Sequence, residues 1–182
     1  MELVGNLLIA PPSVKNSFWY KASVLVTEHH SEGSMGIVLN KKSNLTVKEF
    51  AQQLGTTLDI PGNIYHGGPI NLKSFTLLHT PEWSCSNTMN ISNQFSLSSA
   101  EDILPMFALG NRPKRWRMFL GVCGWSPNQL INEIKGNPPY QHDTSWCLAS
   151  ADYDTVFDLD GNDQWCSCID RSAFEFAQNI LA

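Results

Sequence analysis

The sequence predicts an α+β fold in which a mixed, largely antiparallel β-sheet is flanked by helices. Strand-like segments dominate the first half of the chain, and segments that open with helix-capping residues are few. Strands and helices alternate only loosely, which disfavours a doubly wound parallel sheet. The 182 residues, 42% of them hydrophobic, carry no internal repeat, low-complexity tract or long polar linker. We therefore expect one compact domain over residues 1–182.

The predicted strands are apolar and β-branched runs bounded by turn-forming residues. The stretch SEGSMG, residues 31–36, supplies a hairpin-like turn between two of them. The run WRMFLGVCGW, residues 116–125, is predicted to be a strand that ends in glycines. The expected strands cover residues 7–10, 22–29, 35–40, 64–65, 74–79, 116–125 and 146–151.

Helices are predicted where a capping residue precedes an apolar periodicity. Thr46 and Glu49 have the spacing of a capping box and open a first helix that Gly55 ends. Its inward face is expected to consist of Val47, Phe50, Ala51 and Leu54. Ser98 and Glu101 suggest a second helix, which Pro105 forces to start later or to kink.

Two further helices are predicted in the last third of the chain. Ser126 and Gln129 have the spacing of a capping box at the start of the first of these helices. Pro127 lies in its first turn and Gly136 at its end. The acidic stretch 158–164 reads as a loop, and Ser172 opens the last helix three residues before Glu175. The residues expected to face inward on this helix are Phe174, Ala177, Ile180 and Leu181.

Charge and cysteine content limit the classes of partner and compartment. The formal net charge of -5 repels phosphate backbones, so direct nucleic-acid binding is not expected. The segment 112–117, RPKRWR, gathers the basic residues and is expected to be a solvated loop with one buried ring. The N-terminal stretch MELVGNLLIAPP resembles neither a signal peptide nor a membrane span. Five cysteines are an odd number, which favours free thiols and a cytoplasmic protein.

Two glycine-rich strand ends supply the candidate binding site. The stretch YHGGPI places His66 before Gly67 and Gly68, and adjacent glycines mark a tight turn with positive φ or a close ligand contact. In GVCGWSPNQL, Gly121 and Gly124 precede a helix start, where unpaired backbone N–H groups can hold an anion. The alternative is that these glycines only allow close packing of strand and helix around a tryptophan. The candidate ligand-binding residues are His66, Gly67, Gly68, Gly121, Gly124, Trp125, Ser126 and Asn40.

A cysteine-dependent enzyme or redox sensor is the alternative function. Cys123 lies one residue before the Gly124 turn, near a helix start that lowers a thiol pKa, and His66 or His79 is available as a base. The chain has no G-x-S-x-G elbow, and a lone cysteine is more often a packing residue. Adjacent His29 and His30 point to opposite faces of a strand, so no metal site is expected. No cofactor is expected either.

Five motifs, in this order along the chain, resemble the AlgH/YqgE family of small bacterial proteins. They are GNLLIAPP, SVLVTEHHSEGSMGIVLNK, YHGGPI, LLHTPEW and GVCGWSPNQLINEI, and the resemblance spans residues 3 to about 157. It implies a compact α+β domain around a sizeable β-sheet, located in the bacterial cytoplasm, without a defined biochemical activity. Members of the family are sometimes labelled transcriptional regulators, but this sequence has no helix-turn-helix pattern.

The chain departs from the family pattern at three places: Lys41-Lys42, the link GNPPYQHDTSW and the segment WCSCIDRS. The preferred function is a non-enzymatic binding or regulatory module with a glycine-lined cleft. Its expected partner is a small anionic ligand or a protein, and any regulation is expected to be indirect.

Overall fold

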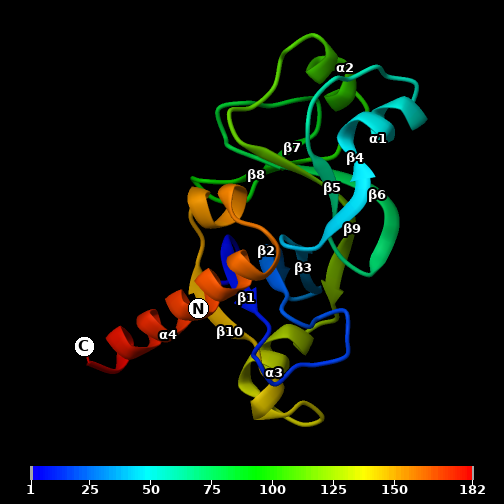
Figure 1. Ribbon diagram of the computed structural model, residues 1–182. Coiled ribbons are helices and arrows are strands. Elements are labelled where there is room, and N and C mark those ends of the chain that lie inside the picture. The colour runs from blue at the N-terminus through cyan, green and yellow to red at the C-terminus, as the bar shows by residue number, and fades with distance from the viewer. Residues whose placement is uncertain (1, 182) are drawn as a thin grey trace.

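The computed structural model describes residues 2–181 and confirms the predicted α+β fold (Figure 1). Ten strands in this range form one mostly antiparallel sheet: β1 (Asn6–Ile9), β2 (Ser23–His30), β3 (Gly33–Val38), β4 (Lys42–Thr46), β5 (Asn63–His66), β6 (Ile70–His79), β7 (Thr88–Asn90), β8 (Ser96–Ser98), β9 (Trp116–Trp125) and β10 (Cys147–Ser150). The helices are α1 (Val47–Gln53), α2 (Ile103–Ala108), α3 (Gln129–Lys135) and α4 (Gly161–Leu181). A 3₁₀ turn covers His142–Thr144 and a π-helical turn covers Asp154–Asp158.

Strand β9 is the central strand of the sheet. One of its sides pairs antiparallel with β6. On its other side, the last residues of β9 pair antiparallel with β3, and its middle residues pair in parallel with β5. The principal strand order is β10-β1-β2-β3-β9-β6-β8-β7, and β4 joins through β5. Because the β5–β9 pair is parallel and the others are antiparallel, the sheet is mixed as predicted.

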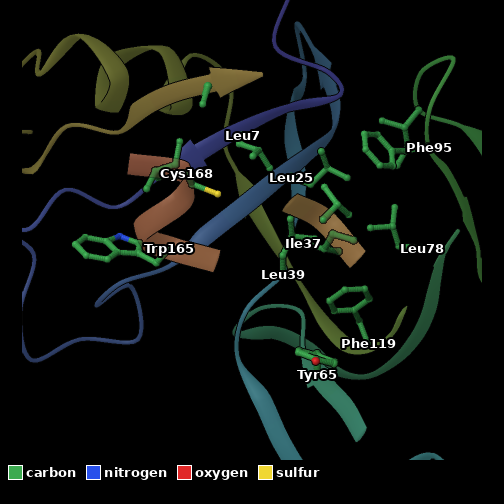
Figure 2. Close-up of a cluster of buried hydrophobic side chains, with 14 of the residues drawn as sticks. Leu7, Leu25, Ile37, Leu39, Tyr65, Leu78, Phe95, Phe119, Trp165 and Cys168 are labelled. Carbon is green, nitrogen blue, oxygen red and sulfur yellow. The ribbon is translucent and has the colours of Figure 1, made fainter. Parts of the chain in front are cut away.

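Buried apolar side chains form three clusters against the sheet. Figure 2 shows the first, in which β1, β2, β3, β6 and β9 contribute side chains that meet Trp165 and Cys168 of α4. A second cluster lies beneath α1 and α2, and a third packs Leu130 of α3 against Val24 and Val38. Each fully buried Leu or Ile in these clusters stabilises the fold by roughly 1.5 to 3 kcal/mol.

The first two helices largely follow their sequence signals. Thr46 caps α1 through both hydrogen bonds of the predicted capping box, and the helix buries Val47, Phe50 and Ala51. Leu54, expected on the same face, is exposed. Helix α2 starts late, at Ile103, so that Pro105 falls in its first turn, where a proline costs no helical hydrogen bond.

The starts of the last two helices differ from the prediction. The N-cap of α3 is Asn128, in a left-handed conformation, and not Ser126; the predicted end at Gly136 is confirmed by its φ of 62°. Helix α4 begins at Gly161, so residues 161–164 are helical, and Ser172 is a buried residue in its middle.

The C-terminal part of α4 extends beyond the sheet (Figure 1). Ile180 and Leu181 are therefore exposed, as are Phe174 and Ala177, and the expectation that they face inward is wrong. The helix instead crosses the outer edge of β10, where Glu175 accepts a hydrogen bond from the Ser150 backbone N–H at 3.0 Å. No helix within residues 2–181 is both long and apolar enough to cross a membrane.

Candidate functional site

The two glycine-rich segments that supply the candidate site lie side by side. Gly67 joins β9 to the end of β3: its N–H donates to the Leu120 carbonyl at 2.8 Å, and its carbonyl accepts from the Val38 N–H at 2.7 Å. A Cβ on Gly68 would lie 2.5 Å from the Cys123 backbone nitrogen, a separation that real Cβ atoms do not reach. The HGGP backbone is therefore pressed directly against the backbone of β9.

The reason for the two adjacent glycines differs from the one expected. Neither Gly67 nor Gly68 has a positive φ, so the predicted left-handed turn is wrong. Gly121, on the facing strand, does have a positive φ of 79°. The glycine pair is required because β9 leaves no room for a side chain, and this contact closes the space in which a ligand was expected.

An open groove lies three residues further along β9, at Gly124. Met35 is the β3 residue opposite Gly124, and Ile70 is the β6 residue opposite Val122, so the missing side chain of Gly124 leaves a gap between two apolar walls. Ile70 is 44% exposed and Met35 36%. The groove has a volume of about 480 Å³, and Trp125, Ser126 and Pro127 close one end of it.

The rim of this groove is acidic. Glu28 and Glu32 line it beside His30, whose Nε2 lies 3.1 Å from the Glu28 carboxylate. At the other end, the Ser126 backbone N–H, one of the groups expected to receive an anion, donates to Gln129 Oε1 at 2.9 Å. The polar groups of the groove therefore favour a cationic ligand or a basic segment over an anion.

The structure separates the remaining candidate residues from the groove. Asn40 is buried, and its amide donates to the carbonyls of Lys21 (2.8 Å) and Gly161 (2.9 Å) and accepts from the Ser23 N–H at 3.0 Å. It joins the end of β3 to the start of α4. His66 is exposed at the end of β5, where its backbone N–H donates to the Lys41 carbonyl. Of the eight candidates, Gly124, Trp125 and Ser126 line the groove.

Cys123 has the properties of a packing residue. Its side chain is 0% exposed, and its Sγ donates to the Gly67 carbonyl at 3.4 Å. Burial raises the pKa of this thiol to about 12, the opposite of what a nucleophile needs. His79 is paired with Trp116 in the sheet, roughly 23 Å along β9 at the rise of an extended strand.

His79 is itself engaged, with Nδ1 2.9 Å from the Thr80 carbonyl and Nε2 2.8 Å from Ser98 Oγ. The geometry therefore gives the cysteine-dependent alternative no support. Within residues 2–181, no three His, Cys, Asp or Glu side chains gather closely enough to hold a metal ion.

Sequence reasoning missed the walls and rim of the groove. Met35 was expected only as the first residue of a strand, Ile70 lay outside the predicted strands, and His30 was considered only as a metal ligand. The alternation in β3 does not mark Met35, because Ile37, two residues further along the same face, is buried.

The AlgH-like family model matches residues 7–177 of the chain. A UPF0301 protein of Photobacterium profundum is 28% identical over 179 residues, which cover 94% of this chain and 92% of the relative. A UPF0301 protein of Shewanella loihica is also 28% identical, with 97% and 95% covered.

Two solved structures share the architecture. The solution structure of the AlgH protein from Pseudomonas aeruginosa superposes with a TM-score of 0.75 at 28% identity, covering 93% of this chain and 88% of the other. A crystal structure from Corynebacterium diphtheriae, at 22% identity and a TM-score of 0.71, covers 91% and 84% and supports the fold. On the strength of the family match across nearly its whole length, the chain belongs to the AlgH-like family.

Proposed function

We propose that the chain is a non-enzymatic binding module that holds a segment of a protein partner in the groove beside Gly124. The observation that carries this proposal is an open apolar groove with an acidic rim: Met35 and Ile70 form its walls, and Glu28 and Glu32 stand above them. Exposed apolar patches with a polar rim are typical of interaction sites.

The chemistry of the groove selects among partners. A small anion would meet two carboxylates, whereas a segment with an apolar residue flanked by Lys or Arg would bury its apolar side chain and place its charges against the rim. We therefore narrow the expected partner from an anion or a protein to a basic, apolar protein segment.

A peptide-display selection tests this assignment. Random peptides selected on the native protein are expected to combine an apolar residue with flanking Lys or Arg, and to lose at least about tenfold in affinity when Ile70 is replaced by Asp. Leu109→Asp is the matched control, because Leu109 is 86% exposed at the end of α2 and lies outside the groove lining. Peptides that bind the Ile70→Asp variant as tightly as the native protein would show that the groove is not the binding site.

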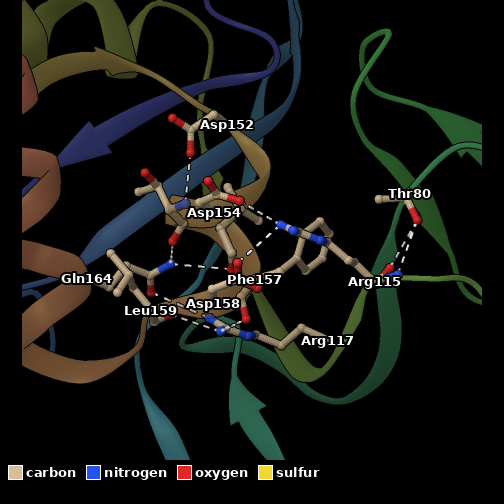
Figure 3. Close-up of polar contacts among 11 residues, drawn as sticks. Thr80, Arg115, Arg117, Asp152, Asp154, Phe157, Asp158, Leu159 and Gln164 are labelled. Atoms are coloured by element: carbon tan, nitrogen blue, oxygen red, sulfur yellow. Dashed lines mark hydrogen bonds and ion pairs between the residues drawn. The ribbon is translucent and has the colours of Figure 1, made fainter.

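Any regulatory role of the module is proposed to be indirect, because two residues of the basic cluster, Arg115 and Arg117, are engaged within the protein itself (Figure 3). The buried Arg117 guanidinium donates to the carbonyls of Phe157 (3.1 Å) and Leu159 (2.9 Å), and Arg115 pairs with Asp154 and Asp158. We also place the module in the cytoplasm, with support from five cysteines that are all unpaired.

A binding assay with duplex DNA at physiological ionic strength checks this point. No salt-dependent binding is expected. Binding that disappears when the exposed Arg112 and Lys114 are changed to Ala would overturn the indirect role; these two positions are used because changing Arg117 would disturb the fold.

A further inference from the structure

A second cavity, with a lining that shares no residue with the groove, contains three aromatic side chains and one carboxylate. Its volume is about 400 Å³, and its lining includes Trp19, Trp146, Tyr140 and Glu133. These residues come from the segment before β2, the segment before β10, and α3 with the loop that follows it.

The carboxylate of Glu133 is fixed by neutral donors. Its Oε2 accepts hydrogen bonds from the indole N–H groups of Trp146 (2.8 Å) and Trp125 (3.0 Å), and its Oε1 accepts from the Gln129 amide at 2.8 Å. Within residues 2–181 no Lys, Arg or His lies at ion-pair distance from it. A half-buried carboxylate is thus held in place by neutral hydrogen-bond donors and has no ion-pair partner among the described residues.

The rings around this charge are arranged as a corner. Trp19 and Trp146 are nearly perpendicular, at 88°, with centroids 5.4 Å apart, and both are half-buried. Trp125, buried behind them, has its centroid 6.4 Å from each. The faces of indole rings carry negative potential and attract cations, trimethylammonium groups above all.

We propose that this cavity binds a substituted ammonium group, with the cation against the faces of Trp19 and Trp146 and its charge balanced by Glu133. A metal ion fits the site poorly, because the carboxylate oxygens already accept three hydrogen bonds and the residues that line the cavity include no second carboxylate. An alkylated ammonium needs no directed bonds, so a ring corner with one fixed carboxylate satisfies it. The anion expected from the sequence would be repelled by the same carboxylate.

Lys15 gives the proposal a second, independent consequence. This exposed lysine also lines the cavity, and its positive charge opposes a bound cation. Replacing Lys15 with Ala is therefore expected to tighten the binding of a simple cation by a factor of about two to five, more at low salt than at high salt.

The test compares choline with its neutral carbon isostere, 3,3-dimethylbutan-1-ol, on the native protein. The readout is the chemical shift of the indole N–H groups of Trp146 and Trp125, whose hydrogen bonds end on Glu133. Choline is expected to shift these signals in a saturable way and to bind about tenfold more tightly than the neutral isostere, whereas sodium chloride of equal ionic strength has no such effect. Equal affinity for the two compounds, or no saturable shift with choline, would overturn the proposal.

Variants then test the assigned groups. Glu133→Gln keeps the shape of the side chain and removes its charge, and is expected to lower choline affinity about tenfold. Glu101→Gln, a charge removal on an exposed residue before α2, is the matched control and is expected to leave affinity unchanged. Trp19→Leu probes the ring at the half-exposed wall, so the proposal remains testable even if Glu133→Gln unfolds. Full choline affinity in Trp19→Leu would contradict it.

The ammonium group belongs to a free small molecule or to a methylated lysine of a protein, and the same assay separates these sources. A short peptide with trimethyllysine that binds more tightly than choline would identify a protein-borne group. Similar affinity for the two would identify the free cation.

Discussion

Strand β9 carries two glycines three residues apart, and their surroundings are opposite. Gly121 faces the backbone of Gly68, so these two backbone segments are in contact and no side chain fits between them. Gly124 faces the flexible end of Ile70 and leaves an open groove. A glycine-rich sequence therefore does not by itself indicate a binding site. The residue opposite the glycine decides whether the glycine allows a close backbone contact or leaves an open groove.

The largest expected effect is at Gly68, with Gly124 as its control. Gly68→Ala drives a Cβ into the backbone of Val122 and Cys123, which cannot move aside, so the free energy of unfolding should fall by about 3 kcal/mol or more. Gly124→Ala meets the Ile70 side chain at 3.2 Å, which can shift, and should cost less than about 1 kcal/mol. Urea unfolding measures both; equal losses would break the comparison.

The second prediction separates backbone strain from steric contact. Gly121 and Gly55 have nearly the same φ, 79° and 76°, but nothing lies within 4 Å of a Cβ on Gly55. Gly55→Ala should therefore cost only the left-handed strain, about 1 to 2 kcal/mol. Gly121→Ala adds a clash with the Gly68 carbonyl and should cost about 2 kcal/mol more in the same unfolding experiment. If the two variants are equally stable, the close contact at Gly121 is not real.

Cys123, between these glycines, gives a prediction about pH. Its folded-state pKa of about 12 lies above its ordinary value of 9.0, so its contribution to stability is complete below pH 9 and is lost as pH rises toward 12. The free energy of unfolding should fall by on the order of 1 kcal/mol more between pH 8 and pH 10 in the native protein than in Cys123→Ala. Identical pH slopes would mean that the thiol is accessible in the fold.

The smallest expected effect concerns the groove wall. Ile70→Ser removes an apolar side chain that is 44% exposed, so it should lower the free energy of unfolding by less than about 1 kcal/mol while it abolishes binding of the selected peptides. Thermal unfolding followed by a peptide titration checks both halves. A large loss of stability would reassign Ile70 from the groove to the core.

Local sequence signals predicted the fold well where contacts between residues close in sequence determine the conformation. The α1 capping box is satisfied by residues three apart, and β9 has the bounds that its apolar run indicated. The start of α4 was missed because distant contacts hold it. The Gln164 amide donates to the Thr155 carbonyl at 2.5 Å, and the Trp165 indole donates to the Ala10 carbonyl at 2.8 Å. A capping pattern in the sequence does not predict hydrogen bonds of this kind.

The candidate site was predicted in part for the same reason. That the two glycine segments meet follows from their both ending strands of one sheet. Whether they leave a space depends on pairings such as Met35 with Gly124, which join residues 89 positions apart. The corner of Trp19 and Trp146 around Glu133 is likewise invisible in the sequence, because its parts come from three separate segments.

The central position of β9 has a consequence for how the protein folds during its synthesis on the ribosome. Strand β3 pairs with β9 through Gly36 and Cys123, so 87 residues must be added before that edge is covered. At ordinary synthesis rates this takes roughly 4 to 17 s. During that interval the β3 edge that β9 later covers stays unpaired, as does the corresponding edge of β5 once that strand has been made, and chaperones or other nascent chains can bind them. These edges therefore cannot be covered until Trp125 has emerged, and a ribosomal pause before that residue would prolong the time in which they can aggregate.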